Sequence, residues 1–149
     1  MMNNKVLVIN GPNLNMLGIR EPDHYGNMTL SQIDKMLLEK AKEYKMKLTC
    51  FQSNSESEIV EKIQSAYGKF DYIIINAAAF THYSIALRDA LKAVGITFIE
   101  VHMSNVDARE DFRKHSVLAD IAYGRISGFG ADSYLLALEA VKRLIDKND

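Results

Sequence analysis

The most suggestive pair of side chains is a glutamate and a histidine two positions apart, Glu100 and His102. Glu100 lies in the segment TFIEV at residues 97–101, which predicts a strand, and His102 follows it; residues two apart on a strand point to the same face. A carboxylate beside an imidazole favours the protonated ring and fixes its tautomer. We therefore interpret His102 as a candidate general acid, with a structural salt bridge at a strand end as the alternative.

A second pair, Arg20 and Tyr25, stands in the long segment 11–28. Loops of about 12–15 residues or more are often lids or binding loops. A guanidinium close to a phenol lowers the pKa of the phenol from its ordinary value near ~10, which makes Tyr25 a candidate general base. Gly18 and Gly26 bracket the pair and are candidate hinges. The alternative is an ordinary surface loop.

Two further groups share helical spacings. His82 and Asp89 stand at positions i and i+7 of one face if a helix begins near His82. Arg109 and Arg113 are four apart in a short helix expected at 109–115, and arginine pairs suit planar carboxylates. The alternatives are a capping histidine and a solvated helix face.

The elements that must position these residues alternate along the chain. Strands are expected at residues 5–10, 47–52, 71–76, 97–101 and 125–128, and helices at 29–45, 55–68, 84–94 and 131–146. Capping boxes are expected at Thr29 with Gln32 and at Ser55 with Glu58. This alternation predicts an α/β fold in one domain, residues 1–149: a flavodoxin-like three-layer sandwich around a five-stranded parallel sheet of order 2-1-3-4-5.

Ligands of such sheets bind beyond the carboxyl ends of the strands. One rim of the predicted sheet collects polar side chains: Asn13, Asn76, His82, Glu100, His102 and Ser104. Lysines fall at the opposite rim, at positions 5, 47 and 69. The sequence therefore predicts a site at the polar rim, unless these residues merely terminate strands.

Composition excludes several classes of protein. With 149 residues, 48% hydrophobic and 25% charged, the chain is neither disordered nor fibrous. A net charge of -1 argues against a nucleic-acid partner, and no apolar run reaches the ~18 residues of a membrane helix. A single cysteine and scattered histidines predict no metal site. Without a leader signature at the N-terminus, we expect a cytoplasmic protein.

The sequence resembles type II 3-dehydroquinate dehydratase. The matching stretches run in family order over most of the chain: GPNLNMLGIREPDHYG at 11–26, QSNSE at 52–56, INAAAFTHYSIALRDAL at 75–91 and EVHMSNVDAREDFRKHS at 100–116. The resemblance implies a flavodoxin-like hydro-lyase of the shikimate pathway. Such an enzyme removes water from 3-dehydroquinate through an enolate, giving 3-dehydroshikimate, and uses no cofactor or metal.

The resemblance also implies roles for single residues. Tyr25 is the expected proton acceptor, activated by Arg20. His102 is the expected proton donor, oriented by Glu100. Asn13 is expected to hold a water molecule that stabilises the enolate.

The remaining family positions concern binding and assembly. Substrate hydroxyls and carboxylate are expected to contact Asn76, His82, Met103, Ser104 and Arg113. Asp89 is expected at a subunit boundary, in a homododecamer built from trimers.

The chain departs from the family pattern in places. Ala77–Ala79 stand where glycines are usual, and an alanine reaches positive φ only with strain. Ser57, Asp107 and Ser133 also replace common family residues.

Other functions require residues that this sequence does not place at the polar rim. A signalling receiver or flavin-binding domain requires acidic or hydroxyl-rich residues after the first strand, where the chain has Asn10-Gly11-Pro12. Dehydration through a lysine Schiff base requires a lysine at the polar rim. The Gly128-Phe-Gly130 turn before the last helix is a weak match to a phosphate-binding turn.

Overall fold

The computed structural model describes residues 4–19 and 27–148. Its centre is a parallel sheet in the order β2-β1-β3-β4-β5, which confirms the predicted fold. The strands are β1 (Lys5–Asn10), β2 (Lys47–Gln52), β3 (Tyr72–Asn76), β4 (Thr97–His102) and β5 (Gly124–Ser127).

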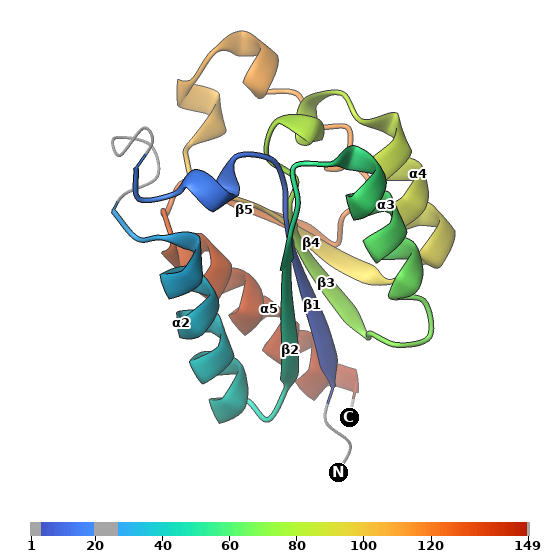
Figure 1. Cartoon of the computed structure of the whole chain (residues 1–149). Helices are drawn as coiled ribbons and strands as arrows, with labels where there is room; N and C mark the ends of the chain where they lie inside the picture. The colour runs from blue at the N-terminus through green and yellow to red at the C-terminus, as the bar shows by residue number, and fades with distance from the viewer. Residues whose placement is uncertain (1–3, 20–26, 149) are drawn as a thin grey trace.

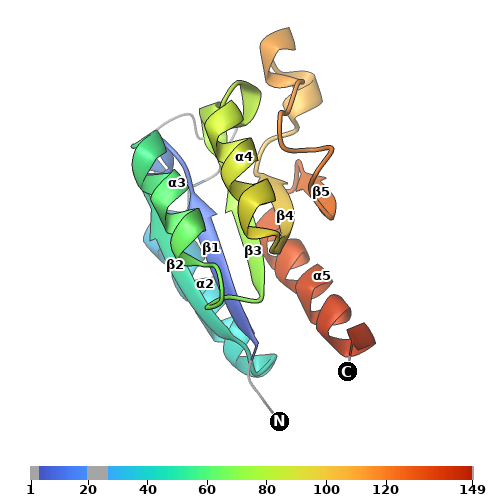
Figure 2. The same cartoon turned by 90° about the vertical axis from the view of Figure 1, so that its right-hand side faces the viewer.

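Helices cover both faces of the sheet. They are α2 (Leu30–Glu43), α3 (Glu56–Ser65), α4 (Ile85–Val94) and α5 (Asp132–Asn148). Helices α2 and α5 lie on one face, and α3 and α4 lie on the other (Figures 1 and 2). Among the described residues, no helix is both long and apolar enough to cross a membrane.

The two predicted capping boxes lie at helix starts, as expected, but one of them forms only in part. The capping box of Thr29 and Gln32 forms in full, each side chain bonding the other residue's backbone N–H. At α3 only half of the box forms: Ser55 accepts from the backbone of Glu58. The Glu58 carboxylate accepts instead from the hydroxyl of Ser53, and this side-chain partner competes with the missing half of the box.

Side-chain alternation along the strands sorts the polar residues onto two faces. Val8 and Ile74 pack in the core beneath α2 and α5, so Asn10 and Asn76, two positions later, continue that face. Phe98 packs in the opposite core, so Glu100 and His102 continue the face beneath α3 and α4. The two sets of polar groups therefore reach the carboxyl edge of the sheet from opposite sides.

The helix expected at 84–94 is confirmed, but the alternative start near His82 and the helix expected at 109–115 are wrong. Helix α4 begins after the N-cap Ser84, whose hydroxyl accepts from the backbone of Leu87, and His82 belongs to a separate 3-10 turn, Ala78–His82. The expected helix at 109–115 is replaced by two 3-10 turns, Val106–Ala108 and Asp111–Arg113. Arg109 and Glu110 between them have extended ψ values of -167° and 147°, which break any helical path.

Candidate active site

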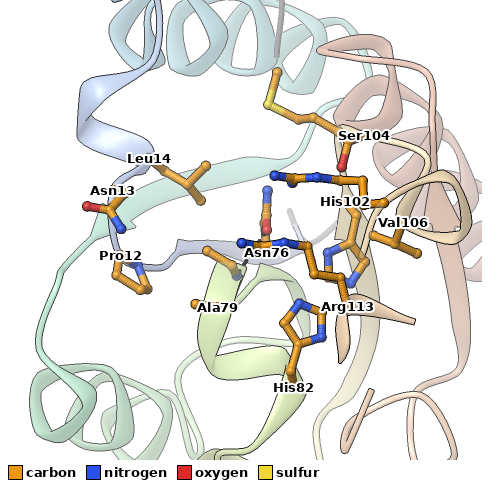
Figure 3. Close-up of a pocket in the computed structure, with 13 residues that line it drawn as sticks. Pro12, Asn13, Leu14, Asn76, Ala79, His82, His102, Ser104, Val106 and Arg113 are labelled. Carbon is orange, nitrogen blue, oxygen red and sulfur yellow. Dashed lines mark hydrogen bonds between the residues drawn. The ribbon is translucent and has the colours of Figure 1, made fainter. Parts of the chain in front are cut away.

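A pocket opens at the carboxyl ends of β1, β3 and β4, where the sequence predicted one (Figure 3). Its lining comprises Pro12, Asn13, Leu14, Asn76, Ala78, Ala79, His82, His102, Met103, Ser104, Val106, Arg109 and Arg113. Of the predicted site residues in the described part of the chain, only Glu100 and Asp89 are absent from this lining. Glu100 lies directly behind His102, whereas Asp89 is exposed on α4.

The predicted acid and its carboxylate are in contact. His102 Nε2 lies 2.5 Å from Glu100 Oε2, and both residues are buried. Since a carboxylate only accepts, Nε2 carries the proton of this bond. Nδ1 is then the nitrogen left for chemistry, and it gives a proton only when the ring is an imidazolium.

Glu100 is held ionised by its surroundings. Burial alone raises the pKa of this carboxyl, but the hydrogen bond and charge of His102, the Arg125 guanidinium and the Ser116 hydroxyl together lower it below its usual range. Ser116 Oγ donates to Oε1 at 3.0 Å, and Arg125 Nε lies 3.5 Å from Oε2. Arg125 is the cross-strand neighbour of Glu100 on β5, so the sheet register brings the two together.

His82 is suited to accept a hydrogen bond. Its Nδ1 lies 2.8 Å from the backbone oxygen of His115, and because a carbonyl only accepts, Nδ1 carries the proton. Burial lowers the pKa of His82, against the hydrogen bond to His115, and the nearby charges of His102 and Arg113 lower it further. The ring is therefore neutral near pH 7, with Nε2 as an acceptor.

Asn13 is held in a left-handed conformation, with φ of 71°. Its backbone N–H donates to Asn54 Oδ1 at 2.9 Å. Gln52 Nε2 donates to the same Asn54 oxygen at 3.2 Å and to the backbone oxygen of Gly11 at 3.1 Å. The QSN stretch after β2 therefore fixes the turn that carries Asn13 into the pocket.

The turn after β3 is both tight and strained. A Cβ on Gly11 would lie 2.5 Å from the backbone oxygen of Ala77, so only glycine fits this close approach. Ala78 has φ of 53°, the conformation for which the family's glycine is suited. The strain expected from the alanine run is therefore present, at Ala78.

The segment after β4 is tied to the glycine turn before α5. Gly128 N–H donates to the backbone oxygen of His102 at 3.3 Å, and Gly130 N–H donates to that of Met103 at 2.8 Å. Phe129 N–H donates to Ser133 Oγ at 3.0 Å. Because these amides are already used, the phosphate-turn alternative is wrong, and the turn instead supports the backbone at Met103 and Ser104.

The two arginines reach the pocket without a shared helix. Arg113 Nε donates to Glu110 Oε1 at 2.9 Å, and its guanidinium carbon lies 4.9 Å from the centre of the Phe112 ring. The Arg109 side chain is only 8% exposed. The pocket lining therefore carries two arginines, whose guanidinium groups suit an anionic ligand group.

Two predicted residues cannot be placed in the site, and three residues that were not predicted support it. Arg20 and Tyr25 lie outside the described residues. Tyr134, Ser116 and Arg125 support the site but were not identified from the sequence. In the described part of the chain, no group of three His, Cys, Asp or Glu side chains is arranged to hold a metal ion.

Comparison with known proteins assigns this geometry to a family. Residues 4–142 match the family model "Dehydroquinase class II". The chain belongs to this family. The class II dehydroquinases similar to it include the type II dehydroquinase of Butyrivibrio crossotus, whose crystal structure superposes with a TM-score of 0.91 at 48% identity, covering 93% of this chain and 97% of that one.

Relatives named 3-dehydroquinate dehydratase are closer in sequence. The one from Vibrio parahaemolyticus is 60% identical over 136 residues, 91% of each chain. The one from Histophilus somni is 52% identical over 143 residues, 96% of this chain and 95% of its own. Family membership makes this chain a hydro-lyase, and its reaction is the dehydration of 3-dehydroquinate in the shikimate pathway.

Proposed function

We propose that the pocket at the carboxyl ends of β1, β3 and β4 is where this reaction takes place, with His102 as the proton donor. The observation that carries the proposal is the buried contact of 2.5 Å between His102 Nε2 and Glu100 Oε2 at the pocket wall. An ionised Glu100 stabilises the imidazolium, which is the form of His102 able to give a proton to a departing hydroxyl.

The chemistry begins with removal of a proton next to the substrate ketone. Tyr25, activated by Arg20, is the proposed base, as the family resemblance implies. The electron pair of the broken C–H bond moves into the ketone and forms an enolate. When the enolate collapses, the bond from carbon to the β-hydroxyl breaks, and His102 gives that oxygen a proton, so the group leaves as water.

The enolate oxygen needs hydrogen-bond donors to lower the barrier. Asn13 is the proposed holder of the water molecule that supplies them. Its place in the pocket lining and the fixed turn around it support this role, because a rigid donor costs no reorganisation during the reaction.

The remaining polar groups suit the substrate's carboxylate and hydroxyls. Arg113, Asn76 and the Met103–Ser104 segment offer donors, and neutral His82 offers an acceptor at Nε2. Such a combination distinguishes a polyhydroxylated carboxylate from an apolar ligand of the same size.

The direct experiment follows enone absorbance after the protein is mixed with 3-dehydroquinate. We expect absorbance to rise with the wild-type protein and Tyr25→Phe to lose at least ~10² in kcat while remaining folded. Borohydride added with substrate should leave the mass of the protein unchanged. A lysine adduct would support the Schiff-base alternative instead, and near-normal kcat in Tyr25→Phe would remove Tyr25 from the mechanism.

We also propose that the enzyme is cytoplasmic and forms a homo-oligomer, a dodecamer built from trimers, with Asp89 at a subunit boundary. Asp89 is exposed on α4, and Tyr83 and Ile85 near it are 61% and 55% exposed. Ile85 and Asp89 are four apart, so they share one helix face, which combines apolar area with a charge. Sedimentation should show the oligomer, and Asp89→Ala should weaken assembly or raise KM. A fully active monomer would contradict the proposal.

A further inference from the structure

One buried tyrosine joins the ends of two strands at the site. Tyr134 of α5 is fully buried, and its hydroxyl lies between two side-chain amides. Asn76 Nδ2 donates to the Tyr134 oxygen at 2.9 Å, and the Tyr134 hydroxyl donates to Asn10 Oδ1 at 2.5 Å. Only Asn76 of these three residues lines the pocket (Figure 3).

The sheet register makes this arrangement possible. Asn10 and Asn76 end β1 and β3 and are direct cross-strand partners. Both continue the face that packs against α5, so one side chain from that helix can reach both amides. Tyr134 stands one turn before Leu138 on the buried stripe of α5, at the height of the two asparagines.

Both ends of the Asn76 amide are thereby occupied. Nδ2 donates to Tyr134, and Oδ1 accepts from the backbone N–H of Ala78 at 3.2 Å. The second hydrogen on Nδ2 remains, because an amide nitrogen carries two. Rotation of the amide would break both bonds, so the Asn76 donor has one orientation.

The buried hydroxyl of Tyr134 keeps its proton. Complete burial raises the pKa of Tyr134 far above that of an exposed tyrosine, so the hydroxyl stays protonated at any pH the enzyme meets. In the described part of the chain, Asn10 Nδ2 has no hydrogen-bond partner. Accepting from Tyr134 is therefore the hydrogen bond that its side chain makes there.

We propose that Tyr134 is a positioning residue for substrate binding, holding the Asn76 amide so that its remaining N–H points at the bound substrate. This inference rests on the proposed role of Asn76 as a substrate ligand. A residue in that role contacts the substrate both before and during the reaction, so a misplaced amide weakens the two states alike, which raises KM and spares kcat.

The test is a double-mutant cycle with steady-state kinetics on 3-dehydroquinate. Tyr134→Phe keeps the ring and removes the hydroxyl; we expect KM to rise about 3- to 10-fold, the worth of a buried neutral hydrogen bond, with kcat within about twofold. Asn76→Ala should raise KM at least as much. In the Asn76→Ala background, Tyr134→Phe should change KM no further, because the group through which it acts is gone.

Tyr72→Phe is the matched control. Tyr72 is 9% exposed, and its hydroxyl accepts from Asn148 at 3.5 Å, near the opposite end of the sheet. This variant loses a hydroxyl from the same core, and its KM should stay unchanged. If Tyr134→Phe does not fold, Asn10→Leu removes the acceptor of the hydroxyl, and the same KM increase is expected.

Three results would overturn the inference: unchanged KM in Tyr134→Phe, an equal KM increase in the wild-type and Asn76→Ala backgrounds, or an equal increase in Tyr72→Phe. Unchanged KM in Asn76→Ala would also overturn it, since Tyr134 would have no ligand to position. Failure of the proposed function appears separately, as a wild-type protein without dehydratase activity or a His102→Ala variant with normal kcat.

Discussion

The two halves of the pocket are built from different chemistry. On the face of α2 and α5, Asn10, Asn76 and Tyr134 form an amide half, joined by hydrogen bonds between neutral groups. On the face of α3 and α4, Glu100 and His102, with Arg125 behind them, form a charged half. Neutral groups keep one protonation state, so the amide half can position a ligand while the charged half changes its protons.

Removing the imidazole of His102 from the charged half should have the largest effect on activity. In His102→Ala we expect kcat to fall by about 10²–10⁴, the usual contribution of a positioned acid. Exchange of the substrate α-proton with solvent deuterium, followed by NMR, should fall much less than loss of the hydroxyl. Equal loss of both steps would mean that His102 binds substrate and does not act as the acid.

Glu100→Gln tests whether charge or hydrogen bonding matters behind the acid. The amide retains a similar shape but no longer stabilises an imidazolium, so kcat should fall about tenfold. Wild-type kcat in this variant would show that the carboxylate charge is dispensable.

Relief of strain in the amide half should change stability and leave activity within about twofold. Ala78→Gly removes a left-handed cost of roughly 1–2 kcal/mol and restores about 0.4–1 kcal/mol of unfolded-state entropy, for a net gain near 0.5–1 kcal/mol. At equal protein concentration, Tm should rise by a few degrees. Ala79→Gly is the control: Ala79 is not at positive φ, so its Tm should fall.

The smallest expected effect is in the pH dependence of stability. Folding lowers the pKa of His82. Its contribution to the free energy of unfolding is therefore full above its ordinary pKa of 6.5 and is lost as the pH falls towards its pKa in the folded protein. The lowered pKa of Glu100 has the same sign in a lower window, since its contribution is full above 4.5 and is lost in more acidic solution.

His82→Asn should separate these two windows. The amide nitrogen can still donate to the His115 carbonyl but does not titrate. The free energy of unfolding, measured by denaturant melts from pH 7.5 to 3.5, should then no longer depend on pH just below 6.5, a dependence worth less than about one proton. Its dependence on pH in more acidic solution should remain. A His82→Asn slope identical to that of the wild type would assign the upper window to another group.

Sequence patterns predicted the features of the fold and the site that depend on short-range periodicity. Continuous apolar runs and helix stripes gave the strand order, and the spacing of Glu100 and His102 gave their shared face and contact. The i, i+7 relation of His82 and Asp89 failed because Ser84 begins a new helix between them. The sequence already predicts the start of this helix at Ser84, an ordinary N-cap residue, so only the alternative start near His82 was wrong.

The amide half could not be predicted in the same way. Tyr134 belongs to a core-facing stripe with Ala137, Leu138 and Val141, and that pattern indicates packing alone. Its hydroxyl partners lie 58 and 124 residues away, and only the completed sheet brings them near. Family resemblance supplied roles for Tyr25 and Arg20 that no described contact tests.

The position of β5 gives the charged half a point of local weakness. Among the described residues, this four-residue strand lies at the edge of the sheet and pairs only with β4, and such edges open at a lower free-energy cost than central strands. Each opening carries Arg125 away from Glu100 and releases the amide of Gly128 from the His102 carbonyl. Amide hydrogens of residues 125–128 should therefore exchange faster than those of β1 and β3. The charges around His102 should fluctuate with these openings, while the hydrogen bonds of the amide half stay formed.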